Sequence, residues 1–99
     1  MNDKVVFVSL LEPGTQKRET FLEEIAPLIW ATRNQPGCLF FDLYCILERE
    51  SIFALHEIWS NYEDRQDHWQ NVIGLQMNTR LGRYLARPME VFELEEVCL

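Results

Sequence analysis

Residues 52–70, IFALHEIWSNYEDRQDHWQ, decide the fold, because within them a strand pattern passes directly into a helix pattern. Alternation over residues 52–59 predicts a strand whose two faces are both largely apolar, as expected where a sheet is covered on both sides. One of these faces carries Phe53, Leu55, Glu57 and Trp59. The SNYE sequence that follows is typical of a capping box, in which Ser60 and Glu63 bind each other's backbone amides, and it predicts a helix to about Gln70.

Further strand patterns lie on either side of this stretch. CLFFDLYCIL, residues 38–47, is rich in aromatic residues, and the ERES turn joins it to residues 52–59 as a hairpin. KVVFVSLL, residues 4–11, predicts a first, well-buried strand. MEVFELEEV, residues 89–97, predicts a last strand. Its apolar residues stand at both odd and even positions, so alternation does not fix its register.

Apolar residues at helical spacing predict two further helices. The first runs from about Gln16 to Asn34, and Thr15 is placed to cap it. Pro27 lies inside this helix and removes one backbone hydrogen bond. Because the apolar spacing continues beyond Pro27, we expect a kink there rather than an end. The other helix follows the NVIG sequence and runs to Leu85.

The predicted order of elements is β-α-β-β-α-β, with one short extra helix before the last strand. Two βαβ halves joined by a hairpin give the ferredoxin-like pattern, an α+β fold with an antiparallel four-stranded sheet and helices on one face. Residues 1–99 are expected to form a single domain. Since the second sheet face is also apolar, we expect a homodimer whose two sheets face each other.

Composition and charge restrict the location and the partners. The formal net charge is -7, which argues against a nucleic-acid partner or an anionic membrane. No stretch approaches the roughly 18 apolar residues of a membrane-spanning helix, and the N-terminal sequence does not resemble a signal peptide. We therefore expect a soluble, cytoplasmic protein. The three cysteines have no CxxC spacing and predict no disulfide framework; Cys38 and Cys45 are expected in the core.

Several polar residues around the central stretch are candidates for chemistry. Asp64 and His68 are four residues apart on the predicted helix, so the carboxylate could orient the imidazole. Glu57 lies in apolar surroundings, where desolvation would raise its pKa, unless an arginine or a backbone amide pairs with it. His56 and Asp67 complete the group, but no HxxxH, HExxH or paired-cysteine spacing is present, so no metal site is expected.

Residues 26–44, APLIWATRNQPGCLFFDLY, and residues 53–69, FALHEIWSNYEDRQDHW, together resemble the antibiotic biosynthesis monooxygenase (ABM) domain family, including members described as quinol monooxygenases. The matching features are the ATR-x-x-PGCL passage at 31–39, the F-x-x-x-E-x-W strand at 53–59, and a histidine nine residues beyond that tryptophan. The resemblance covers essentially the whole chain, in the same order of elements. It implies a dimeric α+β barrel that oxidises quinols or related aromatics with O₂ and uses no cofactor.

For the site, the resemblance implies catalytic roles for His68 and Glu57 and a substrate contact from Trp59. Further substrate contacts are expected from Phe53 and Phe41, which belong to a dense set of aromatic residues that could line an apolar pocket, and from Asp64, which helix spacing suggests. The imidazole of His68 should then border an apolar cavity walled by Trp59 and other aromatic rings, as a proton acceptor or hydrogen-bond donor toward a small aromatic substrate.

One departure from the family leaves other functions open. Many relatives have a second histidine after the helix histidine, where this chain reads NVIG at residues 71–74. A non-catalytic dimer that binds a small apolar ligand is therefore an alternative. An isomerase or a signal-degrading enzyme that uses the same pocket and base is another.

Overall fold

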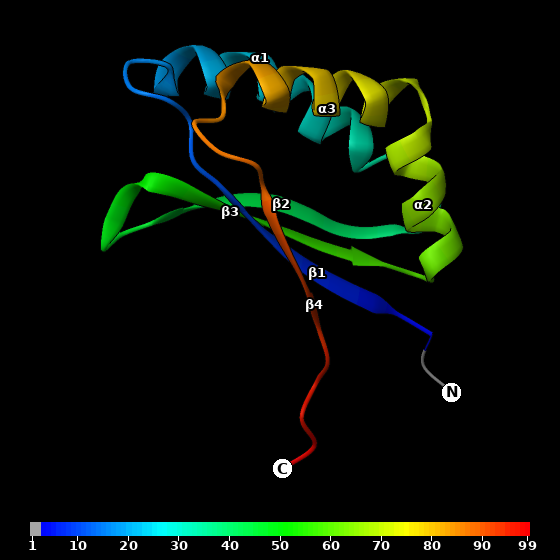
Figure 1. Cartoon of the computed structure of the whole chain (residues 1–99). Helices are drawn as coiled ribbons and strands as arrows, with labels where there is room; N and C mark the ends of the chain where they lie inside the picture. Colours follow the sequence, from blue (N-terminus) through cyan, green and yellow to red (C-terminus); the bar gives the residue numbers. More distant parts are fainter. Residues whose placement is uncertain (1–2) are drawn as a thin grey trace.

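The fold is that of a computed structural model, which describes residues 3–99. Its elements are β1 (Val5–Leu11), α1 (Arg18–Thr32), β2 (Cys38–Ile46), β3 (Arg49–Trp59), α2 (Tyr62–Gln70), α3 (Val72–Tyr84) and β4 (Glu90–Leu94). The strands form an antiparallel four-stranded sheet in the order β2-β3-β1-β4, and the helices of the described residues lie on one face of it (Figure 1). The predicted ferredoxin-like α+β fold is confirmed.

Strand β3 is an inner strand of the sheet and lies between β1 and β2. The register places Glu57 beside Phe7 of β1 and Phe41 of β2. The side chains of β3 alternate as the sequence predicts, so its buried residues share the face toward the helices. These buried residues are Phe53, Leu55, Glu57 and Trp59.

The other sheet face has no helix over it within the described chain (Figure 1). The register places its side chains in cross-strand pairs such as Phe40 with Ile58 and Val8 with Phe92. Apart from Asp42 and His56, which face each other across β2 and β3, the centre of this face is apolar. The face is therefore largely hydrophobic and half-exposed.

The start of α1 differs from the expectation. The helix begins at Arg18, and Lys17, not Thr15, occupies the N-cap position and makes no side-chain capping bond. The predicted capping role of Thr15 is therefore wrong. The reason lies in Gln16, whose φ of 64° is in the left-handed region and cannot continue a right-handed helix. Pro27 lies inside α1, which continues to Thr32, so the expectation that it does not end the helix is confirmed.

The start of α2 is displaced by one residue from the predicted capping box. Asn61, not Ser60, is the cap, and its side chain accepts a hydrogen bond from the Asp64 amide at 2.8 Å. The backbone amide of Ser60 instead donates to the Gly37 carbonyl at 2.8 Å, which ties the end of β3 to the loop before β2. This tertiary bond competes with the local capping pattern.

Other details of the fold also differ from expectation. Strand β4 ends at Leu94, three residues before the predicted end. Cys38 and Cys45 are half-buried at the edge of the core rather than inside it. The helices α2 and α3 meet at Asn71, which ends α2 and caps α3 by accepting a hydrogen bond from the Gly74 amide at 3.1 Å.

Candidate active site

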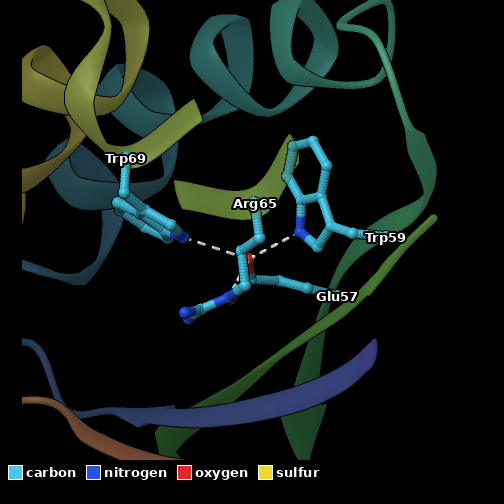
Figure 2. A network of polar contacts seen from close by, with 4 residues as sticks. All are labelled: Glu57, Trp59, Arg65 and Trp69. Carbon is cyan, nitrogen blue, oxygen red and sulfur yellow. Dashed lines mark hydrogen bonds and ion pairs between the residues drawn. The ribbon is translucent and has the colours of Figure 1, made fainter. Parts of the chain in front are cut away.

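The centre of the site is the carboxylate of Glu57, which is fully buried on β3. Its Oε1 accepts hydrogen bonds from the indole of Trp59 at 3.0 Å, the indole of Trp69 at 3.1 Å and Nε of Arg65 at 3.2 Å. Its Oε2 accepts from Nη2 of Arg65 at 3.2 Å. Figure 2 shows these groups converging on the carboxylate, with the two indoles on opposite sides.

This network defines what Glu57 can do. Of the alternatives that the sequence leaves open, the structure shows the pairing with an arginine, Arg65. Because the carboxylate oxygens already accept these hydrogen bonds, little capacity remains to receive a substrate proton. Glu57 is thus built to hold Trp59, Trp69 and Arg65 in place.

Arg65 reaches from α2 down to the sheet, where it also contacts an aromatic ring. Its guanidinium carbon lies 3.6 Å from the centre of the Phe7 ring, a cation–π contact, and its side chain is 21% exposed. Arg65 therefore joins α2 to both β1 and β3.

His68, on the same helix, is enclosed by aromatic rings and 1% exposed. Its ring stacks on Trp59 with centroids 5.2 Å apart. The rings of Phe41 and Trp69 approach it edge-on, at 5.5 and 4.8 Å. Burial, with the charge of Arg65 as a second cause, lowers the pKa of His68 from 6.5 to about 4, so the imidazole is neutral at pH 7.

The two nitrogens of His68 have different surroundings. Nδ1 is hydrogen-bonded to Oε1 of Gln35, which comes from the loop between α1 and β2. An amide oxygen only accepts, so in this arrangement Nδ1 carries the proton and Nε2 keeps a free lone pair. Nε2 is buried and has no hydrogen-bond partner among residues 3–99. A neutral imidazole with an unused buried acceptor is suited to take a proton or a hydrogen bond from a ligand.

The loop that carries Gln35 is docked on the start of α2. Gly37 has a φ of 78°, in the left-handed region that favours glycine. A Cβ atom on Gly37 would lie 2.1 Å from Oδ2 of Asp64, so the Asp64 side chain fills the space that a larger residue would need. The predicted orientation of His68 by Asp64 is wrong, because Asp64 packs against Gly37 and Gln35 makes the bond to the ring.

The backbone on the other side of His68 is equally confined. A Cβ atom on Gly74 would lie 2.1 Å from the His68 carbonyl oxygen and 2.7 Å from the Cα of Trp69. Only glycine lets the first turn of α3 lie this close to the end of α2. The NVIG sequence, which departs from the family pattern, thus supplies a packing contact beneath the candidate site.

A surface depression of about 470 Å³ lies beside this network. It is lined by Tyr62, Arg65, Gln66, Trp69, Gln70, Asn78, Met89 and Val91. At its rim, Tyr62 donates a hydrogen bond to Glu93 of β4, and this bond raises the pKa of the Tyr62 phenol. His68 does not line the depression, but Trp69 does, and Trp69 also packs on the imidazole.

The structure brings together some of the predicted site residues and separates others. Phe41, Glu57, Trp59 and His68 form one cluster between β2, β3 and α2. The rings expected to wall a cavity around His68 are packed on the imidazole itself. Phe53 shares the buried face of β3 but packs on Phe21 of α1, at 5.6 Å between ring centroids. It is six residues from Trp59, about 20 Å along a strand at ~3.3 Å per residue.

Gln35, Arg65 and Trp69 are the site residues that the sequence does not reveal. Gln35 stands at an unspecified position of the ATR-x-x-PGCL passage. The adjoining Pro-Gly pair is the only local signal, since it marks a turn whose neighbours could be held against another element. Trp69 follows His68 directly, and on a helix adjacent residues are about 100° apart. Helical spacing therefore gives no reason to expect the Trp69 and His68 side chains at the same site.

Further properties concern metals and membranes. Within residues 3–99, no three His, Cys, Asp or Glu side chains gather as metal ligands. None of the helices that the structure describes is long and apolar enough to cross a membrane.

The fold and the cluster define an α+β protein of the ferredoxin-like class. A sequence model of the family "Antibiotic biosynthesis monooxygenase" matches residues 5–72, and the chain belongs to this family. Among curated proteins, it is 23% identical over 90 residues to the uncharacterized protein sll1783 of Synechocystis. The match covers 91% of this chain and 61% of that protein, so the chain spans about three fifths of its relative's length.

Solved structures share the fold closely. Rv0793 from Mycobacterium tuberculosis superposes with a TM-score of 0.87 at 22% identity, and the match covers 97% of each chain. A Nitrosomonas europaea protein with a provisional name as an antibiotic biosynthesis monooxygenase gives 0.90 at 18% identity, over 98% of this chain and 93% of that one. A conserved protein from Methanosarcina mazei gives 0.90 at 19% identity, over 97% and 95%.

Proposed function

We propose that this protein is a monooxygenase that oxidises a small electron-rich aromatic compound, such as a quinol, with O₂. The observation that carries the proposal is the neutral, buried imidazole of His68, whose Nε2 has no partner in the described chain and which lies among aromatic rings. Membership of the monooxygenase family supports the reaction class. The substrate itself supplies the electrons, and no cofactor is needed in this proposal.

The chemistry follows from proton transfer to Nε2. A phenolic O–H proton passes to His68, and the released electron density makes a hydrogen-bearing ring carbon, ortho or para to that oxygen, nucleophilic. This carbon forms a bond to O₂, and the resulting peroxide anion takes the proton back from His68 to become a hydroperoxide. As the O–O bond breaks, the ring C–H proton passes by way of His68 to the departing hydroxide, which leaves as water. The O–H and C–H groups become the two carbonyls of a quinone, and four electrons pass to O₂.

The surroundings of His68 are suited to these steps. A developing phenolate beside the imidazole favours the imidazolium, so substrate binding raises the low pKa of His68 toward a useful value. We place the substrate's entry at the depression lined by Trp69, since this ring contacts His68 as well. Phe41 and Trp59 are proposed as substrate contacts. Phe53 is not part of this site because it lies six residues along β3 from Trp59 and packs on Phe21 of α1. A substrate contact by Asp64 stays a prediction.

Oxygen consumption by the purified protein tests the function. We expect O₂ uptake above the autoxidation rate with some members of a panel of quinols and hydroxynaphthalenes, without added metal. With ¹⁸O₂, one labelled oxygen atom should enter the product for each O₂ consumed. Uptake no faster than autoxidation over the whole panel, or product oxygen derived from water, would contradict the proposal.

A non-catalytic function has one observation in its favour. Because His68 does not line the depression, a ligand could occupy it without meeting a base. Quenching of tryptophan fluorescence by the same compounds, without O₂ uptake, would identify a ligand-binding protein instead.

We also propose that a second copy covers the open sheet face, and that the protein acts in the cytoplasm. Phe92 and Leu94 of the edge strand β4 are both 46% exposed on this face, so these large apolar side chains lie open to solvent. Sheet-to-sheet packing of two copies would bury them and their neighbours Val8 and Ile58.

The molecular mass of the protein in solution tests the proposed dimer. At micromolar concentration we expect a mass twice that of the chain, by light scattering or sedimentation. Ile58→Glu places a charge in the centre of the face and should give monomers. Leu75→Glu, at an apolar residue of α3 that is 55% exposed, is the matched control and should stay dimeric. A monomeric wild type would contradict the proposal.

A further inference from the structure

We infer that Gln35 is a positioning residue that sets the tautomer of His68. Its side-chain oxygen accepts a hydrogen bond from Nδ1–H, and Nε2 is thereby left as the acceptor. The catalytic meaning of this role rests on the proposed function, but the tautomer itself does not. A free histidine side chain prefers the opposite form, with the proton on Nε2, so a specific partner is needed to reverse the preference.

The backbone of Gln35 is fixed at both of its polar groups. Its amide donates to the Thr32 carbonyl at 3.0 Å, and its carbonyl accepts from the Cys38 amide at 3.1 Å. Two residues further on, the Gly37 carbonyl accepts from the Ser60 amide at 2.8 Å, which holds the loop on the entrance to α2. Gln35 is therefore presented to His68 from a loop that is anchored at both ends.

The ring of His68 has little freedom to find another partner. Trp59 stacks on one face, at 27° between ring planes, and the edges of Phe41 and Trp69 close the sides. Beneath it, Gly74 packs on the His68 carbonyl. The charged group that acts on the ring is Arg65 of α2, which is paired with Glu57 of β3. With the ring held, the remaining variable is which nitrogen carries the proton, and Gln35 decides it.

The experiment compares Gln35→Leu with wild type by NMR of ¹⁵N-labelled histidine at pH 7. The chain has two histidines, so His56 is an internal reference, and the His68 signals are assigned by their loss in His68→Phe. We expect the Nδ1–H tautomer of His68 in wild type and mainly the Nε2–H tautomer in Gln35→Leu. Asn34→Leu, an exposed residue of the same loop, is the matched control and should keep the wild-type spectrum.

Kinetics give the second readout. With a substrate that shows O₂ uptake, Gln35→Leu should lower kcat by up to the about 10²–10⁴-fold that a general base contributes, with a smaller change in KM. Gln35→Glu keeps an acceptor and adds a negative charge, so it should keep the tautomer and raise the pKa of His68. The acidic limb of kcat/KM should then move to higher pH.

The outcomes separate the two proposals. If wild type lacks the Nδ1–H tautomer, or Gln35→Leu retains it, the role of Gln35 is overturned. If Gln35→Leu does not fold, the Gln35→Glu titration decides, and an unchanged His68 pKa overturns the role. If the tautomer changes as expected but wild type consumes no O₂, Gln35 still positions His68 and the monooxygenase proposal is what fails.

Discussion

His68→Phe is expected to lower kcat by about 10²–10⁴-fold, the usual contribution of a general base. Phenylalanine keeps a flat ring between Trp59 and Trp69 but removes Nε2, the acceptor on which the proposed proton transfer depends. Oxygen uptake at saturating substrate measures the loss. The matched control is His56→Phe, at the other histidine of the chain, on the opposite sheet face, and it should keep kcat within about twofold.

The melting temperature of His68→Phe distinguishes a catalytic role of His68 from a structural one. In His68→Phe the lost bond to Gln35 is offset by removal of a buried nitrogen that lacks a partner in residues 3–99, which by itself costs about 1–3 kcal/mol. A near-wild-type melting temperature with lost turnover supports catalysis. His68→Asn, whose amide can still reach Gln35, should be equally inactive. Full activity in either variant would contradict the assignment.

Because of the low pKa of His68, both kcat/KM and the stability of the folded state should fall in acid. In the free protein the imidazole takes up a proton only as pH falls through about 4. We expect kcat/KM to be unaffected by His68 down to about pH 5 and to fall below it. Because the unfolded chain binds this proton already near 6.5, the folded state also loses stability as pH falls from 6.5 toward 4. His68→Phe should lack this part of the acid destabilisation.

The sequence predicts the face of each β3 residue but not its distance from the site. Alternation places Phe53, Glu57 and Trp59 on one buried face, and the structure agrees. Alternation carries no information on which end of the strand a helix covers. Phe53 therefore faces α1, whereas Trp59 faces α2 and His68.

The partner of His68 could not be predicted for a related reason. Helical spacing relates residues three or four apart, and it suggested Asp64. The true partner, Gln35, is 33 residues away, and its approach depends on the docking of its loop through the Gly37 carbonyl and the Ser60 amide. The same tertiary bond moved the cap of α2 from Ser60 to Asn61. Local rules fail here where a long-range contact fixes the backbone.

Removal of the buried carboxylate is expected to give the largest loss of stability. Glu57→Leu leaves Arg65 and the indole N–H groups of Trp59 and Trp69 without their acceptor. Breaking a buried ion pair from one side costs about 3–5 kcal/mol. Arg65 is 21% exposed and can turn partly toward water, so we expect the lower end of this range. Denaturant unfolding followed by tryptophan fluorescence measures the change.

Comparison variants test whether the unpaired donors cause the loss. Glu50→Leu, at an exposed glutamate of the same strand, should change stability by no more than about 0.5 kcal/mol. In Glu57→Leu with Arg65→Met, the stranded charge is gone as well, so the double variant should recover part of the stability that the single one loses. A single-variant loss below about 1 kcal/mol would show that the network is not what holds α2 on the sheet. A strictly additive double variant would show that Glu57 and Arg65 act independently, against the shared geometry of their hydrogen bonds.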